Sequence, residues 1–333
     1  MSKEDLKRLI DECTRQIKDD RKNLDAYFRR GLAYIELEQY HKAINDFTDI
    51  IKINPRIAMA YADRAFCYHN LEEYDRAVPD YTKAVDLNLK EPGIYYYRGR
   101  SRFFTEDYEG AISDLTKVIP AEPDYYDIYV WRGNAYYKLR EYKLALKDIN
   151  KAIKLNPDDA YIYMYRGYIY DDLKEHKKAV TEYTKAIKKE PDCVHFYLYR
   201  ARDYLALDKY KKAINDYTKI LEFNFDENYT IEAYVNRGSA YKDIDENELA
   251  IKDLNQVINM EGISTDAMEI AYKSRGEAHF GLNKYSEALI DFAIALELNP
   301  YNEIVIGALE KCVEACKKRL ETAKAELKQK SEN

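Results

Sequence analysis

An internal repeat of about 34 residues constrains the fold of this chain more than any other feature of its sequence. Eight arginines recur, and each is followed by a glycine or an alanine. Successive arginines lie 34 residues apart five times, and then 37 and 38 residues apart. They are Arg30, Arg64, Arg98, Arg132, Arg166, Arg200, Arg237 and Arg275. A period of this length predicts small structural units that stack on one another, rather than separate globular domains.

Within one period, the apolar residues are spaced as they are on two helices. Tyr27 and Tyr34 lie on one helical face, and Ala43 and Phe47 lie on another. A proline such as Pro55 follows the second helix in most periods, and it stops that helix because proline cannot continue the backbone hydrogen bonds. Each unit is therefore predicted to be a helical hairpin.

Residues 24–302 resemble the tetratricopeptide repeat family. The pattern of that family is an aromatic residue, three residues, Gly, two residues and Tyr, followed later by Ala, Phe and Pro. In the first repeat these positions hold Tyr27, Gly31, Tyr34, Ala43, Phe47 and Pro55. The resemblance implies an all-α fold: a right-handed α-solenoid, or superhelix, of eight stacked antiparallel helix pairs.

The two ends of such an array need capping elements, because a terminal repeat has no neighbour to cover one of its faces. We expect residues 1–23 to form an N-terminal capping helix equivalent to half a repeat. Residues 24–302 are expected to form the eight repeats. Residues 303–333 are expected to form a C-terminal capping helix and a polar tail.

An acidic residue follows every recurring arginine by sixteen residues. This spacing predicts an ion pair between the two helices of each hairpin, rather than a row of arginines that bind anions. The acidic residues are Asp46, Asp80, Asp114, Asp148, Glu182, Asp216, Asp253 and Asp291.

Pro79 falls inside the predicted second helix of the second repeat, where it lacks the N–H donor that a helix needs. We expect this helix to start late, with Asp75 as its cap, or to kink.

Charge and composition exclude several classes of protein. The formal net charge is −7, whereas binders of nucleic acid or anionic membranes need a basic face. The sequence has no run of about eighteen apolar residues, so we expect no membrane span. The N-terminus is charged where a secretory signal is apolar. The five cysteines are an odd number spread over a long chain, unlike the dense pattern of a disulfide scaffold. A cytoplasmic protein with reduced thiols is predicted.

No motif in the sequence predicts catalysis, a cofactor or a metal site. Cys312 and Cys316 lie four residues apart, and Cys193 and His195 lie two apart, but neither pair has obvious further ligands. We therefore expect a protein that is not an enzyme and that has no cofactor and no metal.

The resemblance implies that the first helix of each hairpin lines a concave groove. The residue before the arginine is aromatic in four successive repeats, which gives an aromatic ladder of Tyr97, Trp131, Tyr165 and Tyr199. Tyr168, Arg100 and Arg202 fall on the same stripe, and residues of these types are frequent in binding hot spots. We predict that these seven residues bind a peptide segment. The alternative is that the ladder only packs between repeats.

Acidic residues flank the ladder: Asp25, Glu36, Asp63, Asp127, Asp172, Glu232, Asp243 and Glu277. The predicted function is a non-catalytic scaffold or adaptor that binds extended, basic or proline-rich segments of other proteins. Two other classes remain open. One is a regulatory subunit of a separate enzyme, and the other is a solenoid that binds RNA or nucleotides by stacking bases on the aromatic residues. The sequence gives no indication of the oligomeric state.

Overall fold

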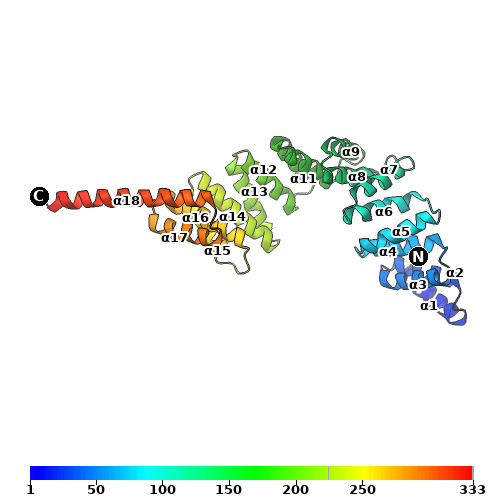
Figure 1. Cartoon of the computed structure of the whole chain (residues 1–333). Helices are drawn as coiled ribbons and strands as arrows, with labels where there is room; N and C mark the ends of the chain where they lie inside the picture. The colour runs from blue at the N-terminus through cyan, green and yellow to red at the C-terminus, as the bar shows by residue number, and fades with distance from the viewer. Residues whose placement is uncertain (224, 332–333) are drawn as a thin grey trace. The chain divides into compact units, whose positions relative to one another are not determined.

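The computed structural model describes residues 1–223 and 225–331, which form eighteen α-helices and no β-strand (Figure 1). In chain order they are α1 (Lys3–Asp19), α2 (Leu24–Glu36), α3 (Tyr40–Ile53), α4 (Ala58–Asn70), α5 (Tyr74–Asp86), α6 (Pro92–Phe104), α7 (Tyr108–Val118), α8 (Tyr126–Lys138), α9 (Tyr142–Leu155), α10 (Ala160–Asp172), α11 (His176–Lys189), α12 (Val194–Ala206), α13 (Tyr210–Phe223), α14 (Glu227–Asp243), α15 (Asn247–Ile258), α16 (Thr265–Gly281), α17 (Tyr285–Leu298) and α18 (Glu303–Ser331).

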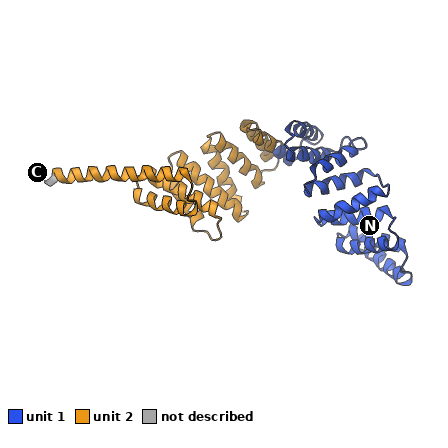
Figure 2. Ribbon diagram, viewed as in Figure 1, with its two compact units in different colours: residues 1–165 blue, residues 166–333 orange. Residues whose placement is uncertain are grey.

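The chain divides into two compact units, residues 1–165 and residues 166–333, and the boundary falls inside α10 (Figure 2). In unit 1, α2 packs on α3, α4 on α5, α6 on α7 and α8 on α9. In unit 2, α12 packs on α13, α14 on α15 and α16 on α17. Consecutive hairpins also pack on each other within each unit, for example through α3 and α4 or α13 and α14. The predicted all-α solenoid of helix pairs is confirmed.

The predicted ion pairs are also confirmed in all eight hairpins. Each recurring arginine lies 2.6–2.7 Å from the carboxylate sixteen residues later. Most of these ion pairs are bidentate. For example, Nε and Nη2 of Arg132 donate to the two carboxylate oxygens of Asp148. The carboxylates are almost entirely buried, so each pair holds the two helices of its hairpin in one register.

The same arginines also bind the preceding hairpin, through a contact that the sequence analysis did not predict. In Arg132, Nη1 donates to Oγ1 of Thr116 at 3.0 Å. Equivalent bonds of 2.6–3.3 Å join six other arginines to a threonine or asparagine of the preceding second helix. These acceptors are Thr14, Thr48, Thr82, Thr184, Thr218 and Asn255. Each such arginine therefore joins three helices.

The small residue after each arginine makes room for a large side chain of the second helix. A Cβ atom added to Gly31 would lie 2.9 Å from the Phe47 ring, and one added to Gly167 would lie 2.4 Å from Tyr183. At Gly99 the nearest atoms belong to Leu115 and to the carbonyl of Ala111. A small residue is therefore favoured at this position chiefly by the large side chain that lies four residues after the alanine of the second helix, which is Ala43 in the first repeat.

The first helix of every hairpin ends in a tight turn with one residue in the left-handed region. These residues have φ between 54° and 62°, and none is a glycine: Glu38, Glu72, Glu106, Arg140, Lys174, Asp208, Asp245 and Asn283. After Glu38, the N–H of Gln39 donates to the carbonyl of Tyr34, as in a Schellman cap. A side chain at such a position costs about 1–2 kcal/mol.

The late start predicted for the helix that contains Pro79 is wrong. α5 begins at Tyr74, one residue before Asp75, and the N-cap residue is Glu73. The second helices of the neighbouring hairpins likewise begin at a tyrosine, Tyr40 or Tyr108. The ring of Tyr74 packs on those of His69 and Phe104, and the missing N–H of Pro79 is tolerated in the second turn of the helix.

A helix lies at each end of the array. α1 provides Thr14 to Arg30 and buries Cys13 against the first hairpin, so it occupies the place of a second helix. α18 buries Val305 and Cys312 against the last hairpin. Its residues from Lys317 to Gln329 are exposed. Across the described ranges, no helix combines the length and the apolar character that crossing a membrane requires.

Arg140→Gly tests the cost of the left-handed turn residues. Arg140 is exposed, with φ of 61°, so glycine should raise the free energy of unfolding by about 0.5–1 kcal/mol. Lys147→Gly is the matched control, because Lys147 is exposed within α9 and glycine inside a helix lowers the stability of the protein by about 1 kcal/mol. Chemical denaturation of the full chain provides the measurement. Equal effects of the two variants would contradict this interpretation.

Candidate protein-binding surface

The seven predicted site residues lie on the first helices of four hairpins, and they divide between the two units. Unit 1 contains Tyr97, Arg100, Trp131 and Tyr165, and unit 2 contains Tyr168, Tyr199 and Arg202. We call the side of each unit that these positions occupy the first-helix face. The two groups are described separately.

Trp131 is the centre of the group in unit 1. Its indole is half-buried, and Nε1 donates to Oδ2 of Asp127 at 3.0 Å. The guanidinium of Arg100 lies over the indole, with Cζ 4.8 Å from the ring centroid. Phe103 and Phe104 of the preceding hairpin contact the indole edge-to-face, with centroid distances of 5.3 and 5.4 Å. Trp131 therefore packs between hairpins and also remains partly accessible.

Two aromatic side chains of this part of unit 1, Phe104 and Tyr125, are more exposed than Trp131. Phe104 is 43% exposed, although its ring stacks on Tyr74 with a centroid distance of 4.4 Å. Tyr125 is 40% exposed, and its ring lies 5.4 Å from that of Tyr96. With Tyr97, Arg100 and Trp131, these two residues form what we call the aromatic patch. Tyr125 precedes α8 and lies outside the helical stripe, so the stripe did not indicate it.

Tyr97 shows that packing between repeats accounts for part of the ladder. Its half-buried ring contacts Phe66 and His69 of the preceding first helix, with centroid distances of 5.1 and 5.4 Å. Tyr165 is half-buried as well, and burial raises its pKa. The ladder residues of unit 1 thus serve the fold, and each still has an accessible portion.

Arg100 is a cation without an acidic partner. Among the residues that the structure describes, no carboxylate lies within ion-pairing distance of its guanidinium, and its Nε is buried without a hydrogen bond. Its Nη1 donates to the hydroxyl of Tyr96 at 3.3 Å, and its other contacts are ring faces. It is thereby held in place while much of its hydrogen-bonding capacity stays unused.

Asp63 is a carboxylate without a cationic partner. It occupies the ladder position of α4, one residue before Arg64, and it is half-buried. No hydrogen bond or ion pair to its side chain occurs within the described ranges. Burial raises the pKa of Asp63 to about 7, and the nearby carboxylate of Glu91 acts in the same direction. The remaining charged or titratable neighbours are Cys67 and Tyr81.

In contrast, other acidic residues that flank the ladder already have partners. Asp127 accepts hydrogen bonds from Tyr96 and Trp131. Lys242 pairs with both Asp243 and Glu277, at 2.7 and 2.9 Å. The acidic flank is therefore less available to a ligand than the sequence suggests, and Asp63 is the clearest exception.

The unit 2 group is more tightly paired. Tyr199 contacts Tyr168 and Tyr183, with ring centroids at 4.7 and 5.9 Å. Arg202 forms an ion pair with Glu232 at 2.6 Å, and its Cζ lies 5.5 Å from the Tyr199 centroid. Arg202 and Glu232 border a surface cavity of about 750 Å³ that reaches α16. This part of the first-helix face is more polar than the aromatic patch.

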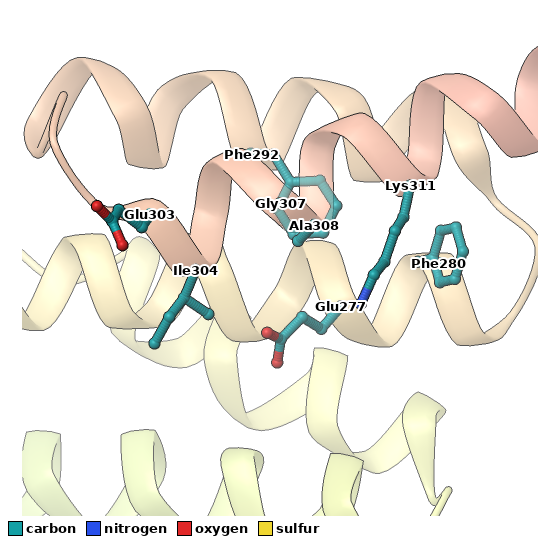
Figure 3. Close-up of a pocket in the computed structure, with 8 residues that line it drawn as sticks. All are labelled: Glu277, Phe280, Phe292, Glu303, Ile304, Gly307, Ala308 and Lys311. Atoms are coloured by element: carbon teal, nitrogen blue, oxygen red, sulfur yellow. The ribbon is translucent and has the colours of Figure 1, made fainter.

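A second cavity, of about 440 Å³, lies in unit 2 where α18 covers the last hairpin. Phe280 and Ile304 supply apolar walls, and the side chain of Lys311 extends from α18 towards Glu277 on α16 (Figure 3). A Cβ atom on Gly307 would meet nothing within 4 Å, so this wall is open. The sequence analysis did not predict the cavity, because α18 was treated only as a cap.

Models of known protein families match five segments of the chain. The description of both models is "tetratricopeptide repeat". The segments are residues 24–57, 58–91, 126–159, 160–193 and 231–262.

Solved structures of two bacterial proteins resemble the chain. One is the C-terminal part of a repeat-containing protein of this type from Cytophaga hutchinsonii, with 22% identity and a TM-score of 0.53. The match covers 85% of this chain and 99% of that one. The other is a tetratricopeptide repeat protein from Parabacteroides merdae, with 18% identity, a TM-score of 0.52 and coverage of 77% and 98%. At these identities the resemblance shows the fold alone. No curated protein sequence matches the chain.

Asp63→Asn tests the environment of the unpaired carboxylate. Because the folded protein raises the pKa of Asp63 from 3.8 to about 7, this residue favours folding most below pH 4, and its contribution is lost as the pH rises through 7. Asparagine cannot ionise. We expect Asp63→Asn to be more stable than the unmodified protein at pH 8, by about 1–2 kcal/mol after a discount for partial solvation. The difference should shrink below pH 5.

The matched control is Asp25→Asn, because the side chain of Asp25 is 78% exposed. It should have little effect at either pH. Thermal unfolding of the full chain between pH 4 and pH 8 measures the difference. An Asp63→Asn variant that is no more stable than the unmodified protein at pH 8 would show that Asp63 is better solvated than its position indicates.

Proposed function

Because the chain belongs to the tetratricopeptide repeat family, we propose that it is a non-catalytic scaffold or adaptor that binds extended segments of other proteins on its first-helix face. The observation that carries this proposal is the aromatic patch of unit 1, with an unpaired Arg100 within it and an unpaired Asp63 one hairpin earlier.

The aromatic patch is suited to an extended segment that contains proline. Proline-rich segments bind to grooves lined by aromatic rings, and they lose little conformational freedom because their backbone is already extended. Phe104 and Tyr125 supply exposed rings, and Trp131 supplies part of an indole. The guanidinium of Arg100 can donate to backbone carbonyl oxygens, which an extended segment leaves unpaired.

Asp63 is suited to a lysine or arginine of the same segment. A half-buried carboxylate without a cation is unfavourable in the free protein, and a cationic side chain would restore its charged form. The ion pair would be less screened than one on an exposed surface. A basic residue in the partner is therefore expected to contribute to affinity and to specificity.

The arginines of the repeat do not support the alternative of RNA binding. All eight are paired with buried carboxylates, so they are not available to phosphate groups, and the net charge is −7. A regulatory subunit of a separate enzyme would use the same surface as a scaffold. The protein partner in that case would be the enzyme.

Phe104→Ala tests the proposal, since Phe104 combines exposure with a place in the patch. Peptides that bind the full chain are first selected from a library of displayed random peptides. Their affinities for the full chain are then measured by fluorescence anisotropy. We expect the selected peptides to contain proline together with lysine or arginine. Phe104→Ala should weaken their binding by about tenfold or more, because an aromatic anchor contributes about 2 kcal/mol.

Leu144→Ala is the matched control: Leu144 is 41% exposed, but it lies on α9, a second helix of the same unit. It should leave the affinities unchanged. Asp63→Asn should weaken only peptides that carry a basic residue. If the peptides bind Phe104→Ala normally and Leu144→Ala poorly, the binding surface is on the second helices and the proposal is wrong.

A further inference from the structure

Three polar side chains converge in unit 2, at the junction of the fifth and sixth hairpins. Asp171 lies near the end of α10, His176 is the first residue of α11, and Asp203 lies within α12. Nδ1 of His176 lies 2.7 Å from Oδ1 of Asp203 and 3.1 Å from Oδ1 of Asp171. One potential ligand atom from each residue lies within 4.8 Å of the other two. Two carboxylates therefore share one imidazole nitrogen.

The burial of Asp203 makes this cluster unusual. Asp203 is only 2% exposed, and its Oδ2 accepts no hydrogen bond within the described part of the chain. Asp171 and His176 are half-buried, so the cluster can be reached from solvent. No lysine or arginine of the described ranges forms an ion pair with either aspartate. A buried carboxylate oxygen without a hydrogen bond is costly, and a bound cation would satisfy it.

The other hairpins show that the fold does not require these three residues. The position of Asp203, three residues after the recurring arginine, is elsewhere occupied by Ala33, Cys67, Ser101, Ala135, Ile169, Ala240 and Ala278.

The two other positions of the cluster show the same contrast. The first residue of the second helix, His176 here, is elsewhere Tyr40, Tyr74, Tyr108, Tyr142, Tyr210, Asn247 and Tyr285. The position of Asp171, five residues after the arginine, is mostly apolar or aromatic: Ile35, His69, Phe103, Tyr137, Leu205, Lys242 and Phe280. All three changes thus meet at a single junction, where they bring together an imidazole and two carboxylates.

We propose that Asp171, His176 and Asp203 bind a divalent metal ion of the zinc class and thereby join the fifth and sixth hairpins. Imidazole nitrogen and carboxylate oxygen are both ligands of Zn²⁺, with bonds of about 2.0–2.2 Å. At a tetrahedral ion, ligand atoms on such bonds lie about 3.3 Å apart. The observed separations of 2.7 and 3.1 Å are shorter than this, and no two of the ligand atoms lie more than 4.8 Å apart, so modest movements of the side chains would admit the ion. Water would complete the coordination.

Titration of the full chain with ZnCl₂ after removal of metals by EDTA tests the proposal. Isothermal calorimetry should give one saturable site per chain, and Zn²⁺ should raise the melting temperature. His176→Tyr and Asp203→Ala install residues that other hairpins carry at these positions, so both variants should fold. Each should lose the rise in melting temperature and bind Zn²⁺ at least about 100-fold more weakly, since even changes outside the ligand set cost 10- to 100-fold.

Two control variants separate this site from other binding of zinc. His41→Tyr removes an exposed histidine of α3, and Cys193→Ser removes a thiol that lies 3.8 Å from Nδ1 of His195. Both should bind Zn²⁺ as the unmodified chain does. The proposal is overturned if the unmodified chain takes up no zinc saturably, or if His176→Tyr and Asp203→Ala retain full affinity. It is also overturned if Cys193→Ser loses the site while His176→Tyr keeps it.

Discussion

The buried pair between the recurring arginine and the carboxylate sixteen residues later is the interaction on which the rest of the structure depends. It fixes the register of the two helices in each hairpin, and Nη1 of the same guanidinium binds the preceding hairpin. Tyrosine rings three residues before the arginines lie beside the guanidinium groups, for example 5.9 Å from Cζ of Arg132. One side chain therefore sets the geometry within a hairpin and between neighbouring hairpins of a unit, which explains why this position does not vary along the chain.

The recurring arginines are already paired with carboxylates, so they are not available to bind other molecules. A binding site must therefore be formed by residues that differ between hairpins. The ladder position holds Arg29, Asp63, Tyr97 and Trp131 in the first four repeats. The side chains of Tyr97 and Trp131 pack on the preceding hairpin and remain partly accessible, so packing and binding are compatible at the same residue. The cluster around His176 follows the same rule, since it replaces packing residues at a single junction.

Much of the fold could be predicted from the sequence because the repeat provides eight examples of each position, so that recurring residue types and spacings can be recognised. Hairpins and ion pairs depend on fixed spacings, and both were confirmed. The threonine contacts were missed because they join hairpins through a side chain with no charge to suggest a partner. The left-handed turns were missed because residues such as Glu38 replace the usual glycine. Asp171, His176 and Asp203 match no metal motif: three helices bring them together, whereas the sequence analysis considered Cys193 and His195.

A double-mutant cycle on Arg132 and Asp148 tests most directly the claim that the arginine holds the array together. The side chains are 15% and 3% exposed. Asp148→Leu alone leaves a buried guanidinium unpaired, so it should reduce the free energy of unfolding by about 3–5 kcal/mol, and Arg132→Met alone should have a comparable effect. The double variant should lose less than the sum of the two single losses, with a coupling energy of about 2 kcal/mol or more. Additive effects of the two substitutions would contradict the account.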